Sequence, residues 1–133
     1  MVKLGASSVI QGKNKEKALL WEQIVGNSLA SKEKYSCVSK KTMVGQLILL
    51  FAKDEIKHRL SYLRTSKVKT GLGGQGGNKG SVAVRFSFDD STFGFMNCHL
   101  ASGQSETKER LSDLKQIVDK SFDLSQKFFE SNT

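Results

Sequence analysis

The sequence predicts an α+β domain, a layered sandwich whose strands form adjacent antiparallel pairs with helices beside them. Helical periodicity at the amino-terminal end is followed by several strand-like runs, and helical periodicity then returns toward the carboxyl-terminal end. The length of 133 residues suits one hydrophobic core and is too short for two domains. There is no internal repeat, low-complexity tract or linker in the sequence.

Residues 15–29 carry the pattern of an amphipathic helix, because their apolar side chains recur at steps of three and four residues. Trp21 belongs to this set, and we expect it in the core rather than on a surface that stacks a ligand. The weakly patterned residues 1–12 predict a loop or a short strand.

The middle of the chain predicts strands. Residues 35–38 predict a short strand and residues 42–52 a buried one, since the second run is apolar on both faces. The charged residues 53–59 predict a turn or a helical turn, and residues 67–70 a further strand.

Two alternating runs then follow a glycine-rich loop. Residues 82–88 alternate apolar and polar side chains, and Asp89, Asp90 and Ser91 have the composition of a hairpin turn. On the next strand one face carries Phe93, Phe95, Asn97 and His99.

A second helix is predicted from Ser105, with Glu106 in its first turn. Its expected apolar stripe consists of Leu111, Leu114, Ile117 and Val118. The tail that follows remains apolar, with Phe122, Leu124, Phe128 and Phe129.

The loop of residues 70–80 is the first candidate for function. Its glycines allow backbone N–H groups and the Lys79 ammonium to approach an anion without obstruction from side chains. Gly71, Gly73 and Gly76 satisfy G-x-G-x-x-G, but a strand pattern follows instead of the helix that a dinucleotide site needs. The alternative is a flexible connection between strands.

His99, with Asn97 two residues earlier on the same face, is the second candidate. The alternative is a structural histidine at a strand end. The net charge of +8 predicts attraction to polyanions such as phosphorylated lipids, inositol phosphates or nucleic acid, and a plain solvated basic surface is the other interpretation.

Two segments together resemble a known family. TGLGGQGGNKGSVAVRF at residues 70–86, followed by FMNCHLASG at residues 95–103, is similar to the centre of the inositol polyphosphate 5-phosphatase domain of the endonuclease/exonuclease/phosphatase superfamily. The similarity extends outward to Tyr35, to residues 43–45, and to Arg110 and Asp113.

The resemblance implies part of a four-layer α/β/β/α sandwich (DNase I-like) and Mg²⁺-dependent hydrolysis of the 5-phosphate of inositol lipids or soluble inositol polyphosphates. By motif position, His99 is the catalytic candidate and would stabilise charge or protonate the leaving oxygen. Asn78, Lys79 and Asn97 would form the substrate and phosphate site, in which Asn97 would help to orient the His99 end of the strand.

The family's metal ligands are the main departure. The glutamate of its Gln-Glu pair would stand immediately before Met1, and its Trp-x-Gly-Asp-x-Asn motif would begin near Thr133. The pairs Asp54-Glu55 and Asp89-Asp90 do not replace them, because they lie in turns without partners at metal spacing. We therefore expect residues 1–133 to be the middle of a phosphatase domain that is inactive alone, with apolar sheet surface left uncovered.

Two other functions stay open. One is a pseudoenzyme that binds anionic phosphoinositides without hydrolysis, and the lower-ranked one is a nuclease of the same superfamily. Cys37 and Cys98 lie in strand-like runs and no secretory leader is visible, so we expect reduced thiols in the cytoplasm. No run approaches the roughly 18 apolar residues of a membrane span, so any contact with a membrane is expected to be peripheral.

Overall fold

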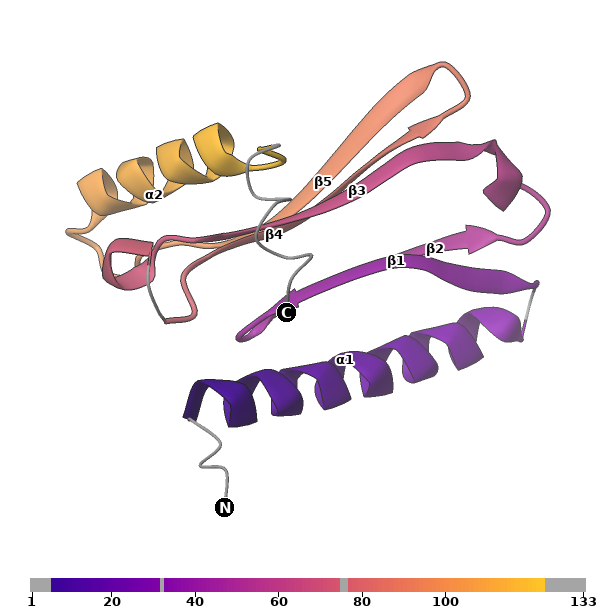
Figure 1. The fold of residues 1–133 in the computed structure, drawn as a ribbon, viewed down its shortest axis with the longest axis horizontal. Helices are drawn as coiled ribbons and strands as arrows, with labels where there is room; N and C mark the ends of the chain where they lie inside the picture. The colour runs from indigo at the N-terminus through magenta and orange to yellow at the C-terminus, as the bar shows by residue number, and fades with distance from the viewer. Residues whose placement is uncertain (1–5, 32, 75–76, 124–133) are drawn as a thin grey trace.

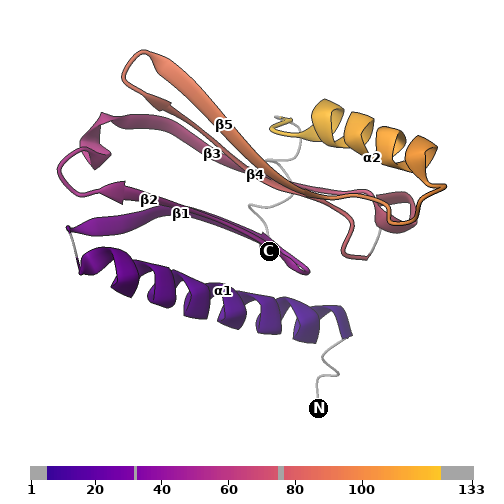
Figure 2. The ribbon, with the colours of Figure 1, turned by 180° about the vertical axis from the view of Figure 1, so that it is seen from behind.

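The structure is a computed structural model that describes residues 6–31, 33–74 and 77–123. Its elements form four layers in the order helix, sheet, sheet, helix (Figure 1). Viewed from behind, the same order is seen, with one helix on each outer side of the paired sheets (Figure 2). The predicted α/β/β/α layering with antiparallel strands is confirmed.

The first sheet is a hairpin of β1 (Tyr35–Met43) and β2 (Gln46–Lys53). The prediction of one buried strand over residues 42–52 is therefore wrong, because the chain reverses between Met43 and Gln46. Gly45 adopts a φ of 72° in this turn, a conformation that costs glycine little. Apolar composition continues through the turn, which is why the pattern suggested one strand.

The second sheet has the order β3-β4-β5, formed by β3 (Leu60–Lys69), β4 (Gly80–Phe88) and β5 (Ser91–His99). Strand β3 begins seven residues earlier than predicted and lacks Thr70 at its end. A short 3₁₀ helix, η1 (Lys57–Arg59), precedes it, as expected of the charged segment 53–59. Asp89 and Asp90 form the predicted hairpin turn between β4 and β5.

The core lies on both faces of β4. Alternation along β4 directs Val82 and Val84 to one face and Ala83 to the other. Asn97, paired with Val82, donates to the carbonyl of Leu47 on β2 at 3.4 Å, so this face looks toward the hairpin. The opposite face is covered by α2 (Thr107–Lys120), whose Ile117 is fully buried.

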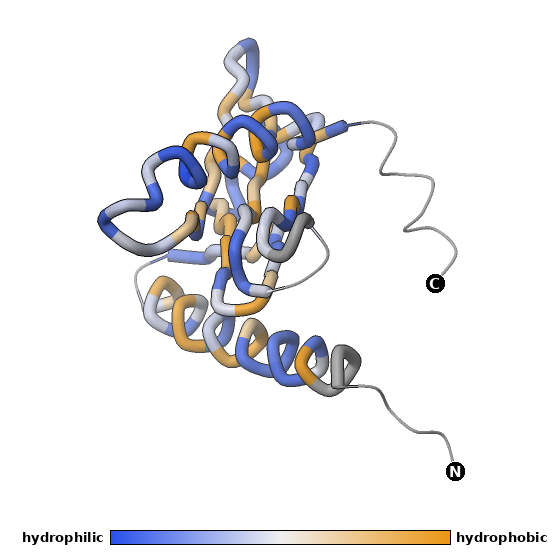
Figure 3. Tube along the Cα trace, turned by 90° about the vertical axis from the view of Figure 1, so that its left-hand side faces the viewer, coloured by the Kyte–Doolittle hydropathy of each residue, from blue (hydrophilic) through white to orange (hydrophobic). Residues whose placement is uncertain are grey.

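Helix α1 (Ala6–Ala30) lies against the hairpin and begins earlier than predicted, so residues 6–12 are helical rather than a loop or strand. Trp21 is 56% exposed, and the prediction that it belongs to the core is wrong. Small side chains make the contact instead: Ala18 is buried, and Gly26 lies where a β-carbon would be 3.6 Å from the Phe51 ring. Polar and apolar segments alternate along this helix (Figure 3).

The predicted apolar stripe of α2 is also largely wrong. Leu111, Leu114 and Val118 are 63%, 42% and 64% exposed, whereas Ile117 and the charged Asp113 are buried. The sheet-facing side of α2 is therefore mostly polar.

Apolar surface is exposed on β5 as well, at Phe93, Phe95 and Met96, which agrees with the expectation of uncovered apolar sheet surface. The predicted tail residues Leu124, Phe128 and Phe129 lie outside the described residues. The backbone N–H of Phe122 donates to the Ser66 hydroxyl at 3.1 Å. In the parts of the chain that the structure describes, no helix is both long and apolar enough to cross a membrane.

Candidate phosphate-binding site

The site forms where the β3–β4 loop meets the end of β5. Gly80 is paired with Lys69 on one side and with His99 on the other, so the register brings the end of the loop against the histidine. A β-carbon at Gly80 would lie 2.0 Å from the Val68 carbonyl oxygen, and its φ is +134°. Only glycine fits this close approach, which fixes where Asn78 and Lys79 enter the sheet.

Lys79 and His99 touch directly. The Lys79 Nζ lies 2.9 Å from His99 Nε2, and His99 Nδ1 lies 3.1 Å from the Asn78 carbonyl oxygen. A lysine ammonium can only donate, so Nε2 accepts from it and the hydrogen of a neutral ring lies on Nδ1, which donates to Asn78. Both side chains are half-buried, so a cation and a histidine are held side by side at an accessible position.

Gln46, the first residue of β2, locks the loop to the hairpin. Its buried side chain donates from Nε2 to the carbonyls of Asn78, at 3.2 Å, and Gly80, at 3.4 Å. Asn78 thus accepts hydrogen bonds from both Gln46 and His99. Sequence reasoning missed Gln46 because it fell inside a presumed continuous strand, although the glycine before it was a usable signal of a turn.

Asn97 is placed on the same face as His99 but contacts a different partner. Its hydrogen bond to Leu47 links β5 to β2, two residue pairs along the strand from His99. Asn78, Lys79 and His99 therefore come together, whereas Asn97 braces the strand that carries His99.

The polar face of α2 holds the segment that follows His99. Asp113 is buried and accepts from the Ala101 N–H at 3.0 Å. Arg110 donates to the carbonyl of Gly103 at 2.6 Å and to that of Ala101 at 3.4 Å. These contacts explain why α2 turns polar residues toward the sheet: they satisfy the backbone groups of residues 101–103.

A cavity of about 440 Å³ opens beside Lys79, between the glycine loop and α2. Its polar lining comes from Thr70, Asn78, Lys79, Ser102, Glu106, Glu109 and Asp113. The Thr70 hydroxyl is buried and has no hydrogen-bond partner among the described residues. The carboxyl groups of Glu106, Glu109 and Asp113 lie on the α2 side of the cavity, so an anion is favoured only at the end next to Lys79.

The same residues are poorly suited to a metal ion. Within residues 6–31, 33–74 and 77–123, no group of three or more histidine, cysteine, aspartate or glutamate side chains is arranged to hold one. Burial raises the pKa of both Cys37 and Cys98, which keeps these free thiols protonated at neutral pH.

A model of the Endonuclease/Exonuclease/phosphatase family 2 matches residues 2–131, and the chain belongs to this family. Among curated relatives, a probable inositol polyphosphate 5-phosphatase of Schizosaccharomyces pombe is 37% identical over 103 residues, which are 75% of this chain and 9% of the relative. Synaptojanin-2 of Homo sapiens is 32% identical over 120 residues, 90% of this chain and 8% of the relative. The chain thus spans about a tenth of the length of these relatives.

The fold also matches a solved structure. The crystal structure of the inositol polyphosphate 5-phosphatase domain of SPsynaptojanin, in complex with inositol (1,4)-bisphosphate and a calcium ion, aligns with a TM-score of 0.66 at 32% identity. The alignment covers 73% of this chain and 29% of that domain structure. The resemblance to 5-phosphatases and the DNase I-like fold are both confirmed.

Proposed function

We propose that this chain contributes the phosphate-binding centre of an inositol polyphosphate 5-phosphatase. The contact between Lys79 and His99 carries the proposal, because it places a cation and a proton-exchanging ring at one accessible point. A phosphate oxygen would take over the ammonium donors of Lys79. That would free the lone pair of His99 Nε2 to bind a proton, and the protonated ring would then stabilise charge on the phosphate or pass that proton to the leaving oxygen.

The substrate class is proposed from relatives and from charge. Related proteins carry the names of inositol polyphosphate 5-phosphatase and polyphosphatidylinositol phosphatase, and the structural neighbour holds inositol (1,4)-bisphosphate. The net charge of +8 suits such multiply phosphorylated ligands. The proposed ligands are soluble inositol polyphosphates and phosphoinositide headgroups, met at a membrane surface in the cytoplasm.

The reaction itself is assigned to the family, with Mg²⁺ as the proposed cofactor of the complete domain. Since no metal-holding cluster occurs among the described residues, we propose that the 133 residues alone bind phosphate without hydrolysing it. The same observation supports a phosphoinositide-binding pseudoenzyme as the second candidate.

The test compares binding and hydrolysis in the same preparation. Lys79→Ala and His99→Ala should each weaken the binding of inositol (1,4)-bisphosphate, measured by calorimetry, by roughly tenfold or more, since each removes a charge-assisted contact. Lys115→Ala, on the exposed side of α2, is the matched control.

Phosphate release from phosphatidylinositol 4,5-bisphosphate is measured with and without Mg²⁺. We expect no Mg²⁺-dependent release from the chain alone. Unchanged affinity in both variants would contradict the assigned phosphate site, and release that requires Mg²⁺ would contradict the binding-only role.

A further inference from the structure

Lysines from three separate elements converge on one side of the sandwich. Two adjoining cavities, of about 460 Å³ and 110 Å³, share Lys15, Thr42 and Lys67 in their linings. We call the surface around them the basic groove, and its lysines are Lys15 of α1, Lys40 and Lys41 of β1, and Lys67 and Lys69 of β3.

The fold explains the convergence. Strand β1 packs against β3, and α1 runs along the outer face of the β1–β2 hairpin (Figures 1 and 2). Residues of all three elements therefore line the two cavities. Lys67 is paired with Val82 and Lys69 with Gly80, which places both lysines on the face of β3 that looks toward the hairpin. They are half-buried at its rim.

All the charged side chains that line the two cavities are lysines. Among the described residues, neither cavity has an acidic residue in its lining. Glu22 pairs with Lys40 at 2.5 Å from the α1 side, and Lys41 and Lys67 each have an interaction of their own. Lys15 and Lys69 form no ion pair with any described residue, so the groove keeps an excess of positive charge.

We propose that the basic groove is a second anion site, which binds a phosphorylated inositol group independently of the Lys79–His99 site. The two sites share no lining residue. Lysine ammoniums on flexible stems suit several phosphates at varied positions, and the larger cavity is of the size that small ligands occupy. The choice of an inositol ring rests on the proposed function, whereas the preference for clustered negative charge rests on the lysines alone.

Nucleic acid is the less favoured occupant. Proteins that hold single strands combine basic grooves with aromatic side chains on which bases stack. No aromatic side chain of the described residues lines either cavity of the groove. Compact phosphate groups need no such surface.

The test removes side-chain charge from the groove and leaves Lys79 and His99 in place. Lys15→Gln combined with Lys69→Gln is compared with Lys108→Gln combined with Lys115→Gln, which removes the same charge from exposed positions of α2. Each pair is made in the unaltered chain and in Lys79→Ala. The probes are inositol (1,4)-bisphosphate, measured by calorimetry, and vesicles of phosphatidylcholine with phosphatidylinositol 4,5-bisphosphate, measured by sedimentation.

We expect the groove variant to lose one of two binding sites for the free inositol phosphate in the otherwise unaltered chain, and the remaining site in the Lys79→Ala background. The control should keep the groove site in both backgrounds. Vesicle binding should weaken roughly 30-fold, at about fivefold for each lysine. If the groove variant loses binding to vesicles alone, the site is supported and its ligand is the lipid headgroup. If it loses binding to both probes, the site also binds the free inositol phosphate.

Binding equal to that of the control with both probes would overturn the proposal. So would a single-stranded oligonucleotide that binds more tightly than either probe and is lost in the groove variant. Failure of Lys79→Ala to change binding would count against the proposed function only, because the groove pair is scored separately.

Discussion

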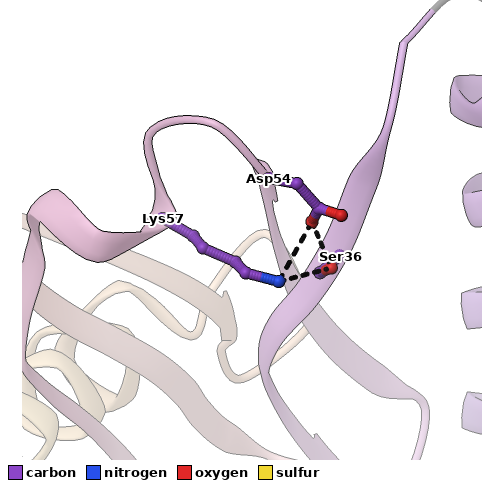
Figure 4. A network of polar contacts seen from close by, with 3 residues as sticks. All are labelled: Ser36, Asp54 and Lys57. Carbon is purple, nitrogen blue, oxygen red and sulfur yellow. Dashed lines mark hydrogen bonds and ion pairs between the residues drawn. The ribbon is translucent and has the colours of Figure 1, made fainter.

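At the scale of single residues, a three-membered polar network closes the open end of the β1–β2 hairpin (Figure 4). Asp54, just after β2, accepts hydrogen bonds from Ser36 at the start of β1 and from Lys57, whose Nζ lies 3.2 Å away. Lys57 also donates to the Ser36 hydroxyl at 3.3 Å. The Ser36 hydrogen bond, and then that of Lys57, lower the pKa of Asp54 below its ordinary value.

This pKa shift gives a pH-dependent prediction. A carboxyl group whose pKa is lower in the folded state stabilises the fold above its unfolded-state pKa, and the effect is lost as the pH falls through the folded-state pKa. Asp54→Asn should therefore lower the melting temperature slightly at pH 7, and the difference from the unaltered chain should vanish in strong acid. The effect is small because the network is exposed to solvent.

Thermal melts followed by circular dichroism would measure this difference in melting temperature between about pH 7 and about pH 2, the range in which carboxyl groups titrate. Asp119→Asn on exposed α2 is the control. A difference that persisted unchanged in acid would show that the network acts through something other than the Asp54 charge.

At the scale of elements, α2 shows two different uses of one helix. Ile117 anchors it to the second sheet, and Asp113 with Arg110 holds the backbone after His99. Leu111, Leu114 and Val118 contribute little to this packing because they face away from the sheet. Helix α2 is thus fastened by one buried apolar side chain and a set of polar contacts.

Shortening a side chain on the buried face of α2 should destabilise the fold much more than shortening one on its exposed face. Ile117→Ala should reduce the free energy of unfolding by about 2–4 kcal/mol, since it leaves a cavity at a fully buried position. Val118→Ala shortens the exposed side chain next to Ile117 and should change the free energy of unfolding by less than about 0.5 kcal/mol. Urea unfolding of both variants measures the contrast, and equal losses would mean that α2 packs on its other face.

At the scale of the whole molecule, positive charge is the dominant property. The net charge of +8 is spread over a small domain, and both proposed anion sites rely on lysine side chains. Long-range attraction of this kind is screened by salt.

Binding to vesicles that contain phosphatidylinositol 4,5-bisphosphate should therefore fall steeply as salt rises from about 0.15 M to about 1 M, where the Debye length shrinks from about 8 Å to about 3 Å. Sedimentation with neutral phosphatidylcholine vesicles provides the baseline. Binding that survives high salt would instead indicate apolar insertion, for which the exposed side chains of β5 are the available surface.

The local sequence pattern was enough to predict the β4–β5 hairpin and the family. Strict alternation and a polar turn specify two paired strands, and the glycine loop with the His99 motif specifies the superfamily. The prediction for residues 42–52 was wrong because an apolar run is compatible with one strand or with two strands around a turn. The structure shows the turn, with Gly45 at a positive φ between the paired Met43 and Gln46.

The sequence by itself determined the α+β class, the positive charge and the candidates Asn78, Lys79, Asn97 and His99. Tertiary structure alone decided that Lys79 meets His99, that Gln46 secures the loop, and that the basic groove exists. These contacts join residues far apart in the chain, and they depend on strand register and layer packing, which local periodicity does not encode. For the same reason, Asp113 rather than Leu114 faces the sheet: backbone groups of another segment required a polar partner there.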